Sequence, residues 1–260
     1  MPRTATKFSI GEFWPKHRPL KYADLFCGIG GFHAAADSLG LECVFACDID
    51  DSCRKSYKEN YGMEPKSDIC TVDVKNIPDI DILLAGFPCQ SFSIIGSREG
   101  FSDARGTLFY EIARVIKGKQ PKGFVLENVR HLTSHNEGKT LSRILEVLRG
   151  LGYQVEYKIL NALNFGLPQK RERILIVGCR GKKIPSAQGF AWPSKKIPMK
   201  PLSEILEKNA DPRHYVSDRI LKSRKAAHKA HVKPSIWHEN KSGYISSHPF
   251  SCALGARASH

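Results

Sequence analysis

The sequence lacks the features that would place it in a membrane, on a secretory route or around a metal ion. It contains no run of about 18 apolar residues, so no membrane-spanning helix is expected. The N-terminal stretch MPRTATKFSIGEFWPKHRP is basic but has no apolar segment of the kind that signal peptides carry. The 8 cysteines form no C-x-x-C pair, and no histidines are paired at zinc-ligand spacing. We therefore expect a cytoplasmic protein with reduced thiols and no bound metal.

Acidic residues are scarce in the last third of the chain. Residues 1–180 carry 25 Lys and Arg against 21 Asp and Glu, whereas residues 181–260 carry 15 against 5. This excess favours a polyanionic partner such as nucleic acid, but a solvated tail would show the same excess. Trp192, Trp237 and Phe250 lie in the basic segment and favour a partly folded module over disorder.

Internal repeats and low-complexity tracts are also absent, and strand-like segments alternate with helix-like segments instead. Such alternation is typical of an α/β fold with a doubly wound, mostly parallel sheet. The last two strands are expected to form an antiparallel hairpin at the edge, and the Pro-, Lys- and Ser-rich texture after Gly181 predicts a domain boundary near residue 180. Strands are expected at 21–26, 42–47, 80–85, 123–126, 154–160 and 174–179, and helices at 31–39, 51–61, 107–117 and 140–151.

The turn after the first expected strand, DLFCGIGG, is rich in glycine but has no basic residue to meet a phosphate. Its glycines allow a ligand to approach the backbone closely, and Asp48, at the end of the second strand, is placed to bind ribose hydroxyls. A nucleoside without phosphates, such as S-adenosylmethionine, fits this pattern better than a dinucleotide. The alternative is a glycine turn with a purely structural role.

A thiol follows the third expected strand, in GFPCQSFS, where Pro88 stiffens the exit and Cys89 comes next. Glu127 heads an ENV tripeptide at the end of the following strand. Carboxyl ends of parallel strands share one rim, so a nucleophile, an acid and a nucleoside site would lie together. That combination suits methylation of cytosine C5, in which a thiolate adds to C6 while an acid binds N3. The alternative for Cys89 is a small core residue.

A pair of arginines lies in a third motif, QKRERI, just before the last expected strand. Arg173 could hold a base carbonyl or a flanking phosphate through its planar guanidinium. A solvated run of charges is the alternative interpretation.

The motifs DLFCGIGGF, GFPCQSFS, RGTLF, ENV and QKRERI occur in this order and resemble motifs I, IV, VI and VIII of the bacterial DNA cytosine-5 methyltransferases. The similarity runs from about Leu20 to Cys179. It implies a Rossmann-like methyltransferase fold and DNA (cytosine-5-)-methyltransferase activity in a restriction–modification system. It also implies S-adenosylmethionine as cofactor, S-adenosylhomocysteine as product, and a flipped-out cytosine of double-stranded DNA as substrate. Because its substrate would be chromosomal DNA, the resemblance further implies that the protein is associated with the nucleoid.

The same resemblance implies roles for individual residues. Cys89 matches the nucleophile, Glu127 the residue on the cytosine N3/N4 edge, Arg173 the arginine at the base O2, and Arg171 its support. A mobile loop from Ser93 to about Arg105 would close over the DNA. The cofactor-binding residues would be Phe26, Gly28, Ile29, Gly30, Gly31, Asp48, Ile49, Asp68, Ile69, Pro88 and Leu108, and the DNA-binding residues Gln90, Ser93 and Arg105.

The resemblance also suggests a domain layout: an N-terminal extension at 1–19, a catalytic and cofactor-binding domain at 20–180, and a basic, partial target-recognition region at 181–260. The family's ninth motif (R-E and Q-G-F-P) and tenth motif (G-N-S-V) have no counterpart in these residues. We therefore expect either a split enzyme, whose second chain supplies these motifs, or a truncated form.

Three other functions are compatible with parts of the sequence. One branch of the same family methylates tRNA cytosine with the same Cys and Glu. A non-catalytic subunit could keep the fold and bind nucleic acid alone, although the complete set of Cys89, Glu127 and Arg173 argues against it. A nicotinamide-dependent oxidoreductase would explain the glycines but would leave the thiol and the basic segment unexplained.

Overall fold

The computed structural model describes residues 18–88, 108–181, 190–194, 196–209, 211, 213, 215–228, 235–239 and 244–252. Four residues with predicted roles, Cys89, Gln90, Ser93 and Arg105, lie outside this part of the chain. The chain divides into two compact units. The first comprises Met1–Asn128, Leu132–Glu156 and Ile176–Phe190, and the second Val129–His131, Tyr157–Leu175 and Ala191–His260. The boundary near residue 180 stays a prediction.

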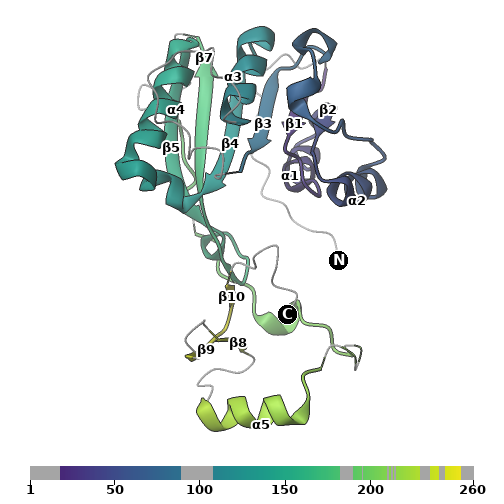
Figure 1. The fold of residues 1–260 in the computed structure, drawn as a ribbon, viewed down its shortest axis with the longest axis vertical. Coiled ribbons are helices and arrows are strands. Elements are labelled where there is room, and N and C mark those ends of the chain that lie inside the picture. Colours follow the sequence, from purple (N-terminus) through teal and green to yellow (C-terminus); the bar gives the residue numbers. More distant parts are fainter. Residues whose placement is uncertain are drawn as a thin grey trace. The chain divides into compact units, whose positions relative to one another are not determined.

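A six-stranded sheet has the order β2-β1-β3-β4-β7-β5 (Figure 1). β1 pairs in parallel with β2 and β3, and β3 with β4. β7 runs antiparallel to β4, because the Arg180 N–H at its end donates to the Lys122 carbonyl just before β4 begins, at 2.9 Å. The strands are β1 (Lys21–Leu25), β2 (Glu42–Cys47), β3 (Ile82–Gly86), β4 (Gly123–Val129), β5 (Tyr153–Asn161) and β7 (Glu172–Arg180). The expected doubly wound, mostly parallel sheet is thereby confirmed, with β7 lying between β4 and β5.

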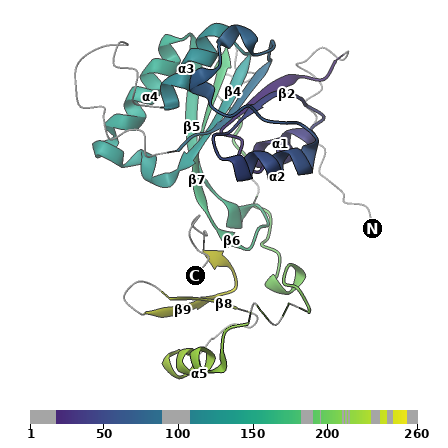
Figure 2. The same ribbon diagram turned by 45° about the vertical axis from the view of Figure 1, so that its right-hand side comes forward.

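Helices cover both faces of this sheet, α1 and α2 on one and α3 and α4 on the other (Figure 2). They are α1 (Gly31–Asp37), α2 (Asp51–Tyr61), α3 (Leu108–Lys119) and α4 (Lys139–Gly150). The ends of α2 follow from its sequence: the Asp50 carboxylate accepts a hydrogen bond from the Cys53 N–H at 3.0 Å, and Gly62 closes the helix with a φ of 71°.

The core of the first unit follows the alternation of side chains along its strands. On one face, Tyr22 and Leu84 pack with Ala36 of α1. Their strand neighbours Ala23 and Leu83 are completely buried as well. Central strands buried on both faces are expected for a parallel sheet covered by two helical layers.

Most predicted strand ends differ from the structure by one to three residues, and two of the differences concern acidic residues. The third strand begins at Ile82 rather than Ile80. Asp81, just before it, pairs its carboxylate with Arg18 and Lys122. The fourth strand continues past Leu126 to Val129, so Glu127 lies within β4 and pairs with Gly86 instead of following the strand.

The second unit contains two small sheets and a helix. β6 (Gln169–Lys170) pairs in parallel with β10 (Ser251–Cys252), and β8 (Ile236–Glu239) pairs antiparallel with β9 (Ile245–His248). The helix α5 (Asp218–Ala227) is followed by His228, whose Nε2 lies 2.9 Å from the Ser247 hydroxyl. Across the described residues of both units, no helix is long and apolar enough to cross a membrane.

Candidate active site

The glycine-rich turn after β1 is held by the end of β2. The Cys27 N–H donates to the Cys47 carbonyl at 3.0 Å, and the Gly28 N–H donates to Asp48 Oδ2 at 2.8 Å. The other Asp48 oxygen, Oδ1, accepts from the Asp50 N–H at 2.9 Å. Two backbone N–H groups thus orient the Asp48 carboxylate. One of them belongs to Gly28, 20 residues earlier in the sequence, so Asp48 meets the glycine-rich turn as predicted from the spacing.

The turn requires an unusual backbone at its edge. Phe26 has a φ of 57°, a left-handed conformation that a bulky residue rarely adopts and that often marks a functional position. Gly30 has a φ of 93°, and a Cβ there would overlap the ring of Tyr61. The Tyr61 hydroxyl donates to the Gly30 carbonyl at 3.0 Å, and the ring stacks on His33 with centroids 3.9 Å apart. The turn is therefore braced from behind by α2.

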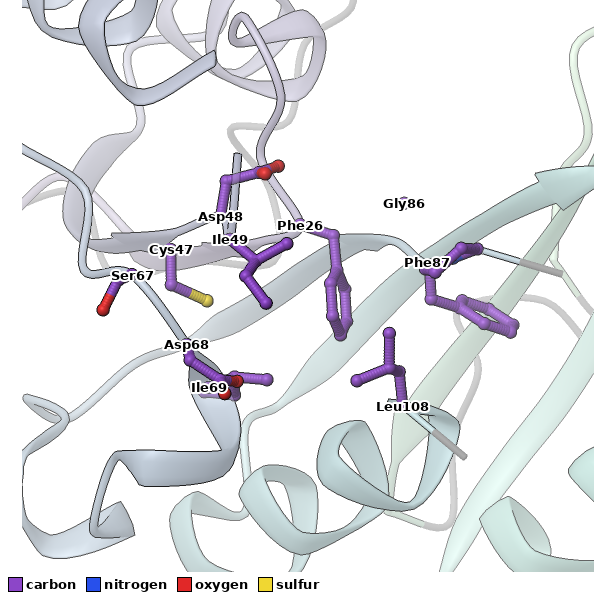
Figure 3. A pocket seen from close by; sticks show the side chains of 11 residues that line it. Phe26, Cys47, Asp48, Ile49, Ser67, Asp68, Ile69, Gly86, Phe87 and Leu108 are labelled. Atoms are coloured by element: carbon purple, nitrogen blue, oxygen red, sulfur yellow. The ribbon is translucent and has the colours of Figure 1, made fainter. Parts of the chain in front are cut away.

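A pocket of about 290 Å³ opens beside this turn (Figure 3). Figure 3 shows the ring of Phe26 reaching into it between the side chains of Ile49 and Leu108. The pocket combines apolar walls with two carboxylates, those of Asp48 and Asp68. Its lining residues are Phe26, Cys47, Asp48, Ile49, Ser67, Asp68, Ile69, Gly86, Phe87, Pro88 and Leu108.

Most of the predicted cofactor residues line this pocket, and four do not. Phe26, Asp48, Ile49, Asp68, Ile69, Pro88 and Leu108 belong to the lining, whereas Gly28, Ile29, Gly30 and Gly31 form the turn behind it. Four further residues of the lining were not predicted from the sequence: Cys47, Ser67, Gly86 and Phe87. Each is a direct neighbour of a predicted residue or of a strand end, and that adjacency was the signal available.

Asp24 is a buried acid next to this site. Its side chain is completely buried, and neither carboxylate oxygen has a hydrogen-bond partner in the part of the chain that the structure describes. Burial, and then the negative charge of Asp48, raise its pKa from 3.8 to about 8. The raised pKa keeps the Asp24 carboxyl mostly protonated at neutral pH, so the two carboxylates of the pocket lining, Asp48 and Asp68, are what make the site favourable for a cation.

These features fit S-adenosylmethionine. Asp48 can accept hydrogen bonds from ribose hydroxyls, and the apolar side chains of Ile49, Ile69 and Leu108 can enclose a flat base. The cationic sulfonium and amino groups suit the carboxylates of Asp48 and Asp68 in the lining. The pocket offers no basic side chain among its lining residues, which agrees with a ligand that has no phosphate.

Glu127 lies beside the strand that leads to Cys89. Gly86 pairs with Glu127 in the β3–β4 ladder, and a Cβ placed on Gly86 would lie 3.6 Å from Glu127 Oε2. The buried Asn128 amide donates to the Phe87 carbonyl at 2.9 Å. The β3–β4 pairing and this hydrogen bond hold the backbone of Gly86 and Phe87 against the ENV tripeptide.

The described thiols differ chemically from a catalytic nucleophile. Burial raises the pKa of each of the six cysteines whose side chains are described, to about 12 for Cys47 at the pocket and to about 11 for Cys70. A raised pKa keeps a thiol protonated and unreactive. None of these six is in a disulfide, and the described residues contain no cluster of His, Cys, Asp and Glu suited to a metal ion.

The two predicted arginines belong to the second unit. The Arg171 carbonyl accepts a hydrogen bond from the Ala162 N–H at 3.0 Å, and Arg173 donates to the Glu172 carbonyl at 2.8 Å. Glu172 also forms an ion pair with Arg130 at 2.8 Å. Arg173 lies inside β7, because the strand begins at Glu172 rather than at Ile174 as predicted.

Comparison with known proteins gives consistent results. The family model described as C-5 cytosine-specific DNA methylase matches residues 20–248. The type II methyltransferase M.NgoBI of Neisseria gonorrhoeae is 49% identical over 243 residues, which are 92% of this chain and 75% of the relative. The type II methyltransferase M.HaeII of Haemophilus aegyptius is 45% identical, covering 94% of this chain and 76% of the relative.

The fold likewise resembles a solved structure, that of DNMT2 from Spodoptera frugiperda. The TM-score is 0.65 at 22% identity, over 79% of this chain and 65% of the other. At this identity the likeness concerns the fold alone. Together with the match of the family model over most of the chain, these results show that the protein belongs to the family of C-5 cytosine-specific DNA methylases.

Proposed function

We propose that this chain transfers a methyl group from S-adenosylmethionine to C5 of a flipped-out cytosine in duplex DNA, with Cys89 as the covalent catalyst and Glu127 as the acid. The observation that carries the proposal is the register of β3 and β4. Glu127 pairs there with Gly86, which lines the pocket and comes three residues before Cys89 in the sequence, and this pairing supports the proposal. The type II methyltransferases among the relatives favour a role in a restriction–modification system.

The chemistry requires cytosine C5 to become nucleophilic. In the proposed reaction, the Cys89 thiolate forms a bond to C6, and Glu127 donates a hydrogen bond or proton at N3 so that the ring becomes an enamine. When bound, S-adenosylmethionine supplies the methyl group that C5 attacks. Loss of the C5 proton and of the Cys89 sulfur then restores the aromatic ring and frees the thiolate. Because a base within a duplex is out of reach of a thiol, it has to leave the stack first.

The roles proposed for the remaining residues follow from chemistry and position. Arg173, with Arg171, would hold the base O2, since a guanidinium donates two parallel hydrogen bonds. Gln90, Ser93 and Arg105 would contact DNA. The cofactor-binding role of Asp48 is supported by its fixed carboxylate, so Asp48→Ala should raise the dissociation constant for S-adenosylmethionine by roughly 10- to 100-fold, the loss expected for hydrogen bonds to a charged group.

Covalent trapping tests the proposed nucleophile. Duplex DNA that contains 5-fluorocytosine should form a stable adduct with the chain in the presence of S-adenosylmethionine, because fluorine cannot leave C5 as a proton does. Cys89→Ser should abolish both the adduct and methyl transfer while leaving the fold intact, and Cys70→Ser, at an exposed thiol, should change neither. An adduct that persists in Cys89→Ser would contradict the assignment.

A second experiment tests the acid and the substrate. Glu127→Gln should keep DNA binding and lose about 10²- to 10⁴-fold in rate, the usual contribution of a general acid. Transfer of a tritiated methyl group to duplex DNA and to total tRNA compares the two nucleic acids directly. Incorporation into tRNA and not into DNA would replace the proposed substrate by the RNA alternative.

The chain spans about three quarters of the length of the two bacterial relatives. We therefore propose that further residues, carried by this polypeptide or by a second chain, complete the enzyme. Copurification with the product of the neighbouring gene, followed by an activity assay with and without it, tests this proposal. Full activity of the 260 residues alone would contradict it.

A further inference from the structure

Arg114 occupies a position that the reaction does not explain. It lies on α3, six residues after Leu108, and its guanidinium reaches the short helical turn η1 (Ile69–Thr71). The side chain is only about one-third exposed, at 35%. None of its nitrogens lines the pocket, yet both elements that it joins contribute lining residues.

The contacts of Arg114 use all three of its guanidinium nitrogens. One terminal nitrogen donates to the Ile69 carbonyl at 2.8 Å and the other to the Val72 carbonyl at 2.9 Å. The Nε donates to Glu111 on the same helix at 2.8 Å, and the two side chains form an ion pair. The Ile69 carbonyl also accepts from the Val72 N–H within the turn at 3.2 Å, and Arg114 is a second donor to it. A cation that binds two carbonyls of a short segment at once fixes that segment.

The fixed segment includes one wall of the pocket. Asp68 caps η1, with its Oδ1 accepting from the Cys70 N–H at 2.9 Å, and Ile69 is 97% buried. On the opposite side, Leu108 is the first residue of α3. A shift of η1 relative to α3 would therefore change the width of the slot between Ile69 and Leu108 and the place of the Asp68 carboxylate.

We propose that Arg114 is a positioning residue of the cofactor site, which holds Asp68 and Ile69 at the separation from Leu108 that a purine requires. The inference rests on the proposed function of this pocket. It goes beyond that function because it makes Arg114, which does not line the pocket, responsible for part of the selectivity for adenine. Lysine cannot replace the arginine, because its single ammonium cannot reach two separated carbonyls in one plane.

The test is calorimetric binding of S-adenosylhomocysteine and of its inosine analogue, in which a carbonyl replaces the adenine amino group. For Arg114→Lys we expect about tenfold weaker binding of S-adenosylhomocysteine, equivalent to one hydrogen bond to a charged group, and a smaller preference for adenine over the inosine analogue. In methyl-transfer assays, the KM for S-adenosylmethionine should rise while kcat changes less than about twofold, as expected when binding and not chemistry is affected.

Two further variants keep the test sharp. Glu111→Gln retains the carbonyl contacts of Arg114 and removes the charge that orients it, so a severalfold loss of affinity in the same direction is expected. Arg143→Lys is the matched control, because Arg143 also pairs with a glutamate three residues away, Glu146 at 2.9 Å, on α4 and away from the pocket lining. It should change neither affinity nor base preference, and unfolding midpoints are measured for all variants.

The outcomes separate the inference from the proposed function. If the unaltered chain binds S-adenosylhomocysteine and both Arg114→Lys and Glu111→Gln keep its affinity and base preference, the role of Arg114 is wrong and the cofactor site stands. If Arg114→Lys does not fold, an unchanged Glu111→Gln overturns the role by itself. If the unaltered chain binds neither ligand, the proposed cofactor site fails, and the inference fails with it.

Discussion

Asp24 carries an ionisable group into β1, an inner strand of the sheet, just before the glycine-rich turn. The carboxyl is completely buried and has no hydrogen-bond partner among the described residues. Isolation of this kind costs folding free energy whenever the group is ionised in the unfolded chain. A cationic cofactor next to it would offset part of that cost, which gives a physical reason for an acid at this position.

The unfolding free energy should therefore depend on pH through Asp24. The unfolded chain releases the proton near pH 3.8 and the folded chain near pH 8, so the folded state binds more protons between these values and loses stability as pH rises. We expect Asp24→Asn to be more stable than the unaltered protein by about 2–4 kcal/mol at pH 7, with no difference below about pH 4.

Urea unfolding from pH 4 to pH 8 measures this difference. Asp79→Asn is the control, because Asp79 is fully exposed and should show no such trend. If Asp24→Asn is less stable than the unaltered protein at pH 7, the carboxyl has a hydrogen-bond partner outside the described residues, and its burial does not cost the predicted free energy. The same variant should bind S-adenosylmethionine less tightly. That result would show that the buried acid lowers the stability of the fold but contributes to cofactor binding.

Gly30 is a residue at which a single methyl group should matter. Its left-handed φ strains any other residue, and a Cβ would also overlap the Tyr61 ring that braces the turn. Gly30→Ala should lower the unfolding free energy by about 2–4 kcal/mol, the sum of backbone strain and overpacking. Gly40→Ala is a matched control, since Gly40 has a φ of 71° but open space at its Cβ, and it isolates the strain. Chemical denaturation measures both variants. If Gly30→Ala and Gly40→Ala lose the same unfolding free energy, the Tyr61 ring moves aside at no cost and the overlap contributes nothing.

At the scale of elements, the N-terminal ends of β1, β3 and β4 are linked through Asp81. Its carboxylate accepts from Arg18 at 2.9 and 3.1 Å and from the Lys21 N–H at 3.0 Å, and it pairs with Lys122 at 2.9 Å. Burial alone would raise the pKa of this group, but the Lys21 N–H and the two cations lower it from 3.8 to about 2. β1, β3 and β4 are thereby joined at the edge opposite the pocket.

The Asp81 network should make stability sensitive to acid. Its carboxylate stabilises the folded state above pH 3.8, and this contribution is lost as pH falls toward about 2. Asp81→Asn should lower the unfolding free energy at pH 7 by about 2 kcal/mol, and the difference should shrink below about pH 4. Urea unfolding at pH 3 to 7 tests this, with Glu64→Gln, at a surface ion pair, as the control. A difference that stays constant with pH would contradict the electrostatic explanation.

At the scale of the whole molecule, charge is unevenly distributed. The net charge is +14, and most of it lies beyond residue 180, in the segment that includes the basic helix α5. None of the side chains of α5 that the structure describes is buried. An exposed cationic surface of this kind favours binding to the phosphates of a nucleic acid.

DNA affinity should therefore fall steeply with salt. Replacing Lys222 and Lys225 of α5 together by glutamate should weaken binding and reduce the slope of log K against log salt by about 2, one unit for each lost phosphate contact. The same change of charge at Lys75 and Lys117, exposed residues of the first unit, is the control and should leave the slope nearly unchanged. Fluorescence anisotropy at several salt concentrations measures the slopes, and identical slopes for both double variants would contradict a DNA contact at α5.

The local features of the fold followed from the sequence. Strand β2 and helix α2 have the predicted bounds, because alternating apolar residues, the Asp50 cap and the stop at Gly62 act within a few positions. The predicted strand ends were less accurate where the end of a strand depends on pairing with a residue far away in the sequence. β4 continues through Glu127 because β3 still pairs with it at Gly86, and no nearby residue signals this pairing.

The sequence by itself determined the family motifs, the glycine-rich turn and the pairing of Asp48 with it, since turn chemistry and strand ends leave a local pattern. Only the tertiary structure decided that β7 lies between β4 and β5, that Asp24 is buried with no hydrogen-bond partner among the described residues, and that Arg114 joins two walls of the pocket. These properties depend on which strands and helices come together, and therefore on contacts between residues far apart in the chain. Those contacts determine the burial and hydrogen bonding of each ionisable group. Burial and hydrogen bonding in turn determine its pKa, its contribution to the free energy of folding and the ligands it can bind.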